Sequence, residues 1–167
     1  MKDSATVSTD RQAEWEDLRQ RHLKPRGERP PSTAGGVHHV ALLCSDVERT
    51  IRFYQDLLGF PLTALFENRD YKGSTHLFFD IGNGNSLAFF DFPGLGLGPY
   101  AEVLAGLHHL AISVTPEAWE AARARLDDAG IPYDNRSGSS MYFSGPDGER
   151  LELLAEPLGR MYGGDVG

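Results

Sequence analysis

Two histidines and one glutamate carry the chemistry that this sequence indicates most strongly. His39 and His109 occupy equivalent positions in two similar segments, GVHHVALLCSD and GLHHLAISVTP, and lie 70 positions apart. Glu152 lies in ERLELLAEP, the last strand-like segment of the second half. Imidazole nitrogen and carboxylate oxygen are ligands that divalent transition metals accept. We therefore predict that His39, His109 and Glu152 hold one divalent metal ion.

The neighbours of these residues agree with a shielded metal site. Alternate side chains of a strand share a face, so Ala41 lies beside His39 and Ala111 beside His109. An unpaired Glu152 would be costly to bury among such uncharged neighbours. A metal ion shared with two imidazoles removes that cost.

The face of the sheet that carries the predicted ligands also carries small and aromatic side chains. Small residues leave room for a substrate above the metal, and aromatic walls favour a flat or apolar one. The alternation turns His38 and His108 toward the opposite face and the helix layer, where we expect structural roles. The predicted substrate-pocket residues are Ala41, Ala88, Phe90, Phe92 and Ala111.

Each histidine segment is followed by the signals of one helix and three strands. A capping box that begins at Ser45 starts the first helix, and Gly59 ends it. Thr115 caps the second helix, Pro116 takes its first position and Gly130 ends it. The expected strands are Leu62 to Phe66, Thr75 to Ile81 and Ser86 to Phe92 in the first half, and Tyr133 to Asn135, Ser140 to Phe143 and Arg150 to Ala155 in the second.

The repeat predicts an α+β fold of two tandem βαβββ modules that form a curved, barrel-like mixed sheet. Each module's open sheet can bury its inner face only against the other module. We expect a polar N-terminal arm over residues 1–35, in which a short helix is compatible with the sequence, and a C-terminal tail over residues 158–167. The folded domain spans residues 36–157, with module one at 36–93 and module two at 106–157.

Composition excludes several classes of function. The 167 residues carry a net charge of -8 and no basic stripe of the kind that binds nucleic acid. The apolar stretches are too short to span a bilayer and the N-terminus has no apolar signal core, so we expect a cytoplasmic protein without membrane contact. The single cysteine, Cys44, cannot form an internal disulfide or a thiolate metal site, and we expect an inert buried thiol.

The sequence resembles the vicinal oxygen chelate superfamily, which includes glyoxalase I, fosfomycin-resistance enzymes, extradiol dioxygenases and bleomycin-binding proteins. The motifs are HHVAL at 38–42, FYQDLLGF at 53–60, HHLAI at 108–112 and GPDGERLELLAEP at 145–157. The resemblance implies one ligand on the first strand and one on the last strand of each module. The fourth such position is Ala88, which leaves a three-ligand site with open coordination positions, the pattern of non-haem Fe(II) oxygenases.

The segment MYFSGPDGERLE resembles the end of the extradiol dioxygenase signature. Tyr142 matches the tyrosine that, in that family, hydrogen-bonds the substrate oxygen at the metal, and we predict a catalytic role for it. The segment departs from the signature twice. Gly145 stands where an acidic or small polar residue is usual, and the stretch before Met141 lacks the acid–base histidine. His76 is the remaining candidate for a proton carrier.

These features favour an Fe(II)-dependent, extradiol-dioxygenase-like enzyme that acts on a catechol or another vicinal-oxygen compound. A glyoxalase-like or fosfomycin-resistance-like lyase, isomerase or transferase with Mn(II), Ni(II) or Zn(II) is one alternative. A metal-free drug-binding protein similar to the bleomycin-binding members is another. We expect a small-molecule substrate of aromatic character, and a homodimer. In this superfamily the two modules pair either within one chain or between two.

Overall fold

A computed structural model describes residues 11–34, 36–135, 137–161 and 164–165. Contacts divide the chain into one unit that ends at Gly36 and a second that begins at Val37. The first unit contains helix α1 (Gln12–His22) and the short 3-10 helix η1 (Arg26–Glu28), in which no residue is buried. Within the described ranges, no helix is long and apolar enough to cross a membrane.

Module one begins with strand β1 (His39–Leu43) and helix α2 (Val47–Ile51), which continues as the π-helical segment η2 (Arg52–Leu57). Strands β2 (Leu62–Glu67), β3 (Thr75–Asp80) and β4 (Ser86–Phe90) follow. The sheet has the order β1-β4-β3-β2. Strand β1 pairs in parallel with β4, and the other two pairings are antiparallel.

Module two repeats this arrangement. It contains β5 (Leu110–Ser113), α3 (Pro116–Asp128), β6 (Tyr133–Asn135), β7 (Ser140–Ser144) and β8 (Arg150–Leu154). The order is β5-β8-β7-β6, again with one parallel and two antiparallel pairings. A small antiparallel pair, β9 (Arg160–Met161) and β10 (Gly164–Asp165), follows. The predicted fold of two βαβββ modules is confirmed.

The local helix signals explain where the two main helices begin and end. Thr115 caps α3 as predicted, because its side chain accepts a hydrogen bond from the backbone N–H of Ala118. The predicted cap of α2 is wrong. The cap is Asp46, whose Oδ1 accepts from the backbone N–H of Arg49 at 2.8 Å. Ser45 is drawn away from the helix, because its hydroxyl donates to Asp147 of module two at 2.5 Å.

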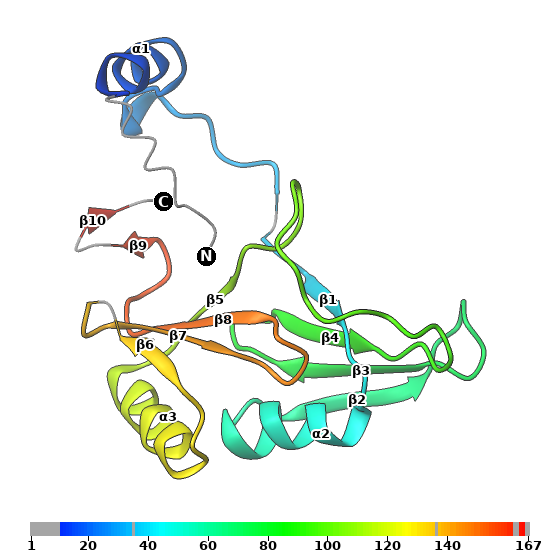
Figure 1. Ribbon diagram of the computed structural model, residues 1–167. Coiled ribbons are helices and arrows are strands. Elements are labelled where there is room, and N and C mark those ends of the chain that lie inside the picture. Colours follow the sequence, from blue (N-terminus) through cyan, green and yellow to red (C-terminus); the bar gives the residue numbers. More distant parts are fainter. Residues whose placement is uncertain (1–10, 35, 136, 162–163, 166–167) are drawn as a thin grey trace, which may run out of the picture. The chain divides into compact units, whose positions relative to one another are not determined.

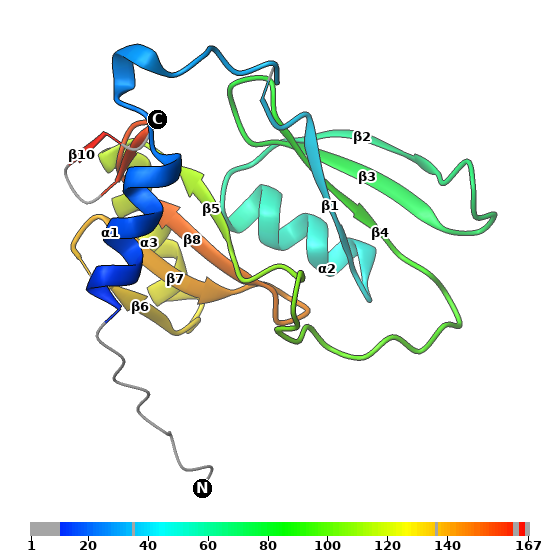
Figure 2. The ribbon, with the colours of Figure 1, turned by 90° about the horizontal axis from the view of Figure 1, so that it is seen from above.

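The two modules share one hydrophobic core. Helices α2 and α3 lie on the same side of the two sheets, which lie next to each other in both views (Figures 1 and 2). The core cluster joins side chains from both modules, among them Phe79 and Phe89 of module one and Met141 and Leu153 of module two. We call the face of each sheet that points away from these helices its open face.

The burial pattern of β1 shows which side chains reach the open face. Val40 and Leu42 are half-buried and pack against the core cluster, whereas His39, Ala41 and Leu43 are exposed. This is the alternation of a strand covered on one side only. The open face of sheet β1-β4-β3-β2 thus remains accessible within the chain.

Polar contacts across the core fix the two modules to each other. The Tyr54 hydroxyl in η2 donates to Oε1 of Glu149 at 2.7 Å, and both residues are buried. Arg125 in α3 donates to the carbonyl of Leu57. Gly145 permits the first contact, because a Cβ atom there would lie 2.1 Å from Glu149 Oε1. The glycine that departs from the resemblance therefore makes room for a buried carboxylate.

Candidate metal centre

Module two brings two of the predicted ligands together on its open face. His109 Nε2 lies 3.2 Å from Glu152 Oε2, and the Glu152 side chain is only 3% exposed. Glu152 Oε1 accepts a hydrogen bond from the Ser140 hydroxyl, which orients the carboxylate. Oε2 is buried and has no hydrogen-bond partner among the described residues. A buried carboxylate oxygen without a partner is costly, so this atom is suited to a cation.

The donor atoms of module two fit a divalent metal ion. Metal–ligand bonds to histidine nitrogen and carboxylate oxygen are about 2.0–2.2 Å long, so two ligands at roughly right angles stand about 3 Å apart. The distance of 3.2 Å between His109 Nε2 and Glu152 Oε2 agrees with that spacing. One imidazole nitrogen and one carboxylate oxygen are a suitable pair for Fe(II), Mn(II), Ni(II) or Zn(II).

Tyr142 lies beside these two ligands. It is the cross-strand partner of Glu152, so both side chains point to the same face. Its ring meets the ring of His109 edge-on, with 5.5 Å between the centroids. The guanidinium carbon of Arg150 lies 4.8 Å from the centre of the Tyr142 ring. The predicted catalytic tyrosine is thus adjacent to two predicted ligands.

The strand register shows how module one differs from module two. Ala41 pairs with Ala88 as Ala111 pairs with Glu152, so Ala88 is the structural counterpart of the glutamate. Phe78, the cross-strand partner of Ala88, corresponds in the same way to Tyr142. His39 meets Phe78 edge-on at 6.0 Å, matching the histidine–tyrosine contact of the other module. Module one therefore offers one histidine and no carboxylate at this site.

The chain does not bring all three predicted ligands together. Over the part of the chain that the structure describes, no group of three or more His, Cys, Asp or Glu side chains could hold a metal ion. His39 lies on the open face of sheet β1-β4-β3-β2, whereas His109 and Glu152 lie on sheet β5-β8-β7-β6. One chain thus holds two separate parts of the predicted site.

The two phenylalanines of the predicted pocket, Phe90 and Phe92, belong to a row of aromatic rings in module one. The His76 ring stacks on Phe90 at 3.9 Å and lies 4.2 Å from Phe78. Phe92 stacks on Phe90 at 6.1 Å. The His76 side chain therefore points to the same face of the sheet as Phe90 and Phe78. Its Nε2 atom is buried and lacks a hydrogen-bond partner among the described residues. Burial chiefly, with a smaller effect of His39, lowers the pKa of His76.

The three predicted alanines differ in their surroundings. Ala41 and Ala111 are exposed, whereas Ala88 is fully buried. A larger side chain at position 88 would therefore have to displace neighbouring atoms, while positions 41 and 111 leave open space over the sheets.

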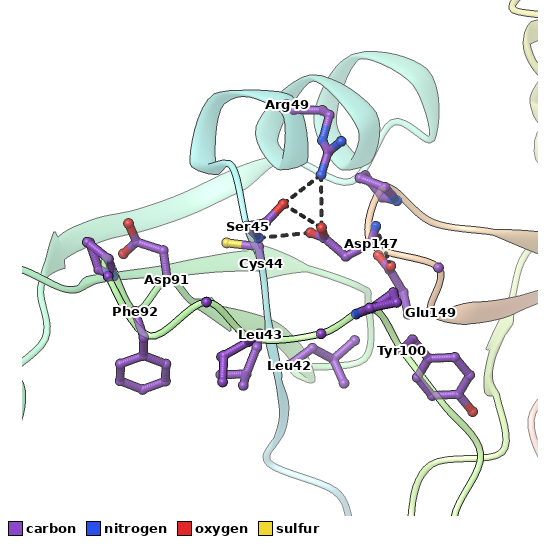
Figure 3. A pocket seen from close by; sticks show the side chains of 18 residues that line it. Leu42, Leu43, Cys44, Ser45, Arg49, Asp91, Phe92, Tyr100, Asp147 and Glu149 are labelled. Carbon is purple, nitrogen blue, oxygen red and sulfur yellow. Dashed lines mark hydrogen bonds and ion pairs between the residues drawn. The ribbon is translucent and has the colours of Figure 1, made fainter.

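A cavity lies elsewhere, between the end of β1, the linker at 91–100 and the turn at 146–149 (Figure 3). Its volume is about 990 Å³. Asp147 accepts from the backbone N–H and hydroxyl of Ser45 and from Arg49, so these polar groups are already paired (Figure 3). Burial raises the pKa of the Cys44 thiol to about 11, which agrees with the inert thiol expected. Neither Asp147 nor Cys44 is therefore a good candidate for a reactive group in this cavity.

Two pairs of adjacent histidines form a contact that sequence parity did not predict. The Nδ1 atoms of His38 and His39 lie 2.9 Å apart, and those of His108 and His109 lie 2.7 Å apart. The expectation that His38 and His108 face the helix layer is wrong, because both are exposed and lie just before their strands begin. The HH dipeptide that occurs in both repeats is the sequence signal for these histidine pairs. No sequence signal indicated the contact between the Ser140 hydroxyl and Glu152.

Comparisons with known proteins identify the family. A family model described as the glyoxalase/bleomycin resistance protein/dioxygenase superfamily matches residues 36–153. The chain therefore belongs to this superfamily, as its sequence motifs predicted. Members of the superfamily are mostly metal-dependent enzymes.

Several relatives show the range of the superfamily. A Bacillus subtilis protein named "Putative ring-cleaving dioxygenase MhqA" is 28% identical over 77% of this chain, which spans 42% of that relative's length. The lactoylglutathione lyase of Haemophilus influenzae is 31% identical over 71% of this chain and 90% of its own. A point mutant of the fosfomycin resistance protein FosX of Listeria monocytogenes, solved with Mn(II) and 1S,2S-dihydroxypropylphosphonic acid, matches with a TM-score of 0.56 and 22% identity, covering 75% of this chain and 96% of its own. The last similarity shows the fold alone.

Proposed function

We propose that this chain is a metal-dependent enzyme whose centre is shared between two copies of the chain. His39 of one copy would join His109 and Glu152 of the other, with the open faces of the two sheets turned toward each other. The observation that carries this proposal is Glu152 Oε2, which is buried without a hydrogen-bond partner among the described residues and lies 3.2 Å from His109 Nε2. A third ligand from a second copy would complete a two-histidine, one-carboxylate set.

The proposed reaction is an Fe(II)-dependent, extradiol-dioxygenase-like oxygenation of a catechol or related vicinal-oxygen compound. Fe(II) would supply Lewis acidity and electron transfer when bound. The row of rings at His76, Phe90 and Phe92 supports a flat aromatic substrate, because aromatic faces stack on such molecules. Tyr142 would donate its hydroxyl hydrogen to a substrate oxygen, since it lies beside both ligands of module two.

Metal analysis is the first test of this proposal. Protein purified without oxygen and reconstituted with Fe(II) is expected to hold about one metal ion per chain. Glu152→Ala should abolish that binding, whereas Glu156→Ala, a carboxylate four residues further along, should keep it. A metal content below about a tenth of an equivalent in the wild-type protein would refute the proposal and favour a metal-free binding protein.

The reaction is tested by oxygen uptake with a panel of catechols. Uptake that depends on Fe(II), and that Tyr142→Phe lowers without a loss of metal, supports the dioxygenase. The lactoylglutathione lyase relative, at 31% identity, is the observation that favours the second candidate, a glyoxalase-like isomerase with Mn(II), Ni(II) or Zn(II). Isomerisation of a thiohemiacetal in the absence of oxygen uptake would replace the first reaction with the second.

A further inference from the structure

The same histidine contact occurs in both modules, at the first strand of each sheet. In each case the ligand histidine and the residue before it bring their Nδ1 atoms together, at 2.9 Å for His38 and His39 and 2.7 Å for His108 and His109. The ring pairs are also alike, with centroids 5.1 and 5.0 Å apart and interplanar angles of 77° and 76°. A geometry that recurs in two independent parts of the chain indicates a built feature.

The distance between the two Nδ1 atoms restricts where the protons can be. Two protonated nitrogens would repel each other, and two bare nitrogens would present lone pairs to each other, so one Nδ1 donates and the other accepts. When both rings are neutral, the donor carries no proton on its Nε2, and the acceptor carries one there. The contact therefore assigns opposite tautomers to the two rings.

We propose that His38 and His108 are positioning residues that accept an Nδ1–H hydrogen bond and thereby leave Nε2 of His39 and His109 free for a metal ion. The inference rests on the proposed function, because it assigns a purpose to a free Nε2. Histidine ligands of metals usually donate their second ring N–H to a fixed acceptor, which holds the tautomer and the ring orientation. Here the acceptor would be the preceding histidine.

The surroundings of module two favour this assignment over the reverse one. His108 Nε2 lies 3.8 Å from Glu102 Oε1, so a proton on that nitrogen faces a carboxylate. Glu102 Oε1 also lies 3.7 Å from Arg150, with which it forms an ion pair. In contrast, Glu152 Oε2 has no hydrogen-bond partner among the described residues even though His109 Nε2 is 3.2 Å away. The 3.2 Å contact lacks the geometry of an N–H hydrogen bond, so it does not fix a proton on His109 Nε2.

Two substitutions at His108 distinguish the loss of the hydrogen-bond acceptor from the loss of side-chain volume. His108→Phe keeps a ring of similar size and removes the acceptor. His108→Asn places an amide oxygen near the former Nδ1 position and restores one. Since His108 is exposed, both variants are expected to fold, and a thermal unfolding curve checks this.

The first readout is the tautomer of His109 in the metal-free protein, from long-range ¹H–¹⁵N spectra at a pH above about 6.5, the ordinary histidine pKa. Wild type and His108→Asn should carry the proton on Nδ1, and His108→Phe should lose that preference. A wild-type His109 with its proton on Nε2 would overturn the proposal. This readout needs no metal, so it remains decisive even if the proposed function fails.

The second readout is the dissociation constant of Zn(II), a redox-silent probe, measured against a competing chelator. The loss of an outer-shell partner typically weakens metal binding about 10- to 100-fold. His108→Phe should show such a loss and His108→Asn should recover most of it, and the same pair at His38 should behave alike. Unchanged affinity in both Phe variants would refute the positioning role while leaving the metal site itself intact.

Discussion

A shared metal centre makes a quantitative prediction for mixed dimers. His39→Ala and Glu152→Ala each damage the site, but they lie on different modules and on the open faces of different sheets. In a dimer formed from one chain of each variant, one site combines the intact His39 of one copy with the intact His109 and Glu152 of the other. The second site receives both substitutions.

The amount of metal that the mixed dimer should bind follows from this count of intact ligands. A two-fold dimer has two equivalent sites, so the mixed dimer should bind about half as much metal per chain as the wild type. Each variant alone should bind almost none. The two chains would carry different affinity tags, mixed dimers would be isolated by two-step purification, and the metal would be measured by elemental analysis.

A second pair of variants tests whether mixed dimers regain metal binding for a reason other than a restored site. His109→Ala and Glu152→Ala both damage module two, so each site of their mixed dimer remains broken and no metal should return. Mixed His39→Ala and Glu152→Ala dimers that bind no more metal than the parents would refute the shared centre. A centre within one chain predicts that result.

Three further predictions concern the buried carboxylate and the aromatic row. Gly145→Ala should lower the free energy of unfolding by about 1.5–3 kcal/mol, because the new Cβ displaces Glu149 from the Tyr54 hydroxyl. Urea titrations measure this loss, which should largely vanish in a Tyr54→Phe background. Additive losses in the double variant would contradict the prediction. Burial raises the pKa of Glu149 above its usual 4.5 despite the Tyr54 bond, so the native state holds this proton more tightly than the unfolded chain. The wild type should therefore lose stability relative to Glu149→Gln as pH rises from 4.5 through the raised pKa, and parallel pH profiles would refute this. His76→Phe should lower kcat about 100-fold or more with unchanged metal content if His76 carries a proton, and an unchanged kcat would exclude that role.

The sequence predicted the modules because their signals are local. Gly59 and Gly130 end the two helices with positive φ of 81° and 66°, as the glycine after each helix pattern predicted. The alternation along β1 placed His39 and Ala41 on one face, and the structure shows both exposed. The equivalence of Ala88 and Glu152 likewise follows from counting along two similar patterns, and the strand register agrees.

Contacts between distant segments could not be predicted in this way. The sequence predicts Ser45 as a helix cap, yet its hydroxyl binds Asp147, which is 102 positions away. The cost of Glu149 burial is offset by Tyr54 from the other module. Sequence parity also assumes a regular strand, and it failed at His38 and His108, which precede their strands. The proposed pairing between copies would leave no local pattern in the sequence.

The single core that both modules share has a consequence for how the protein becomes active. Because Tyr54, Phe79, Met141 and Leu153 are already buried within one chain, folding does not have to wait for a partner. The proposed centre would then arise only in a second, bimolecular step, so activity per chain would fall on dilution below the dimer dissociation constant. Protein concentration, rather than folding, would set how many centres exist.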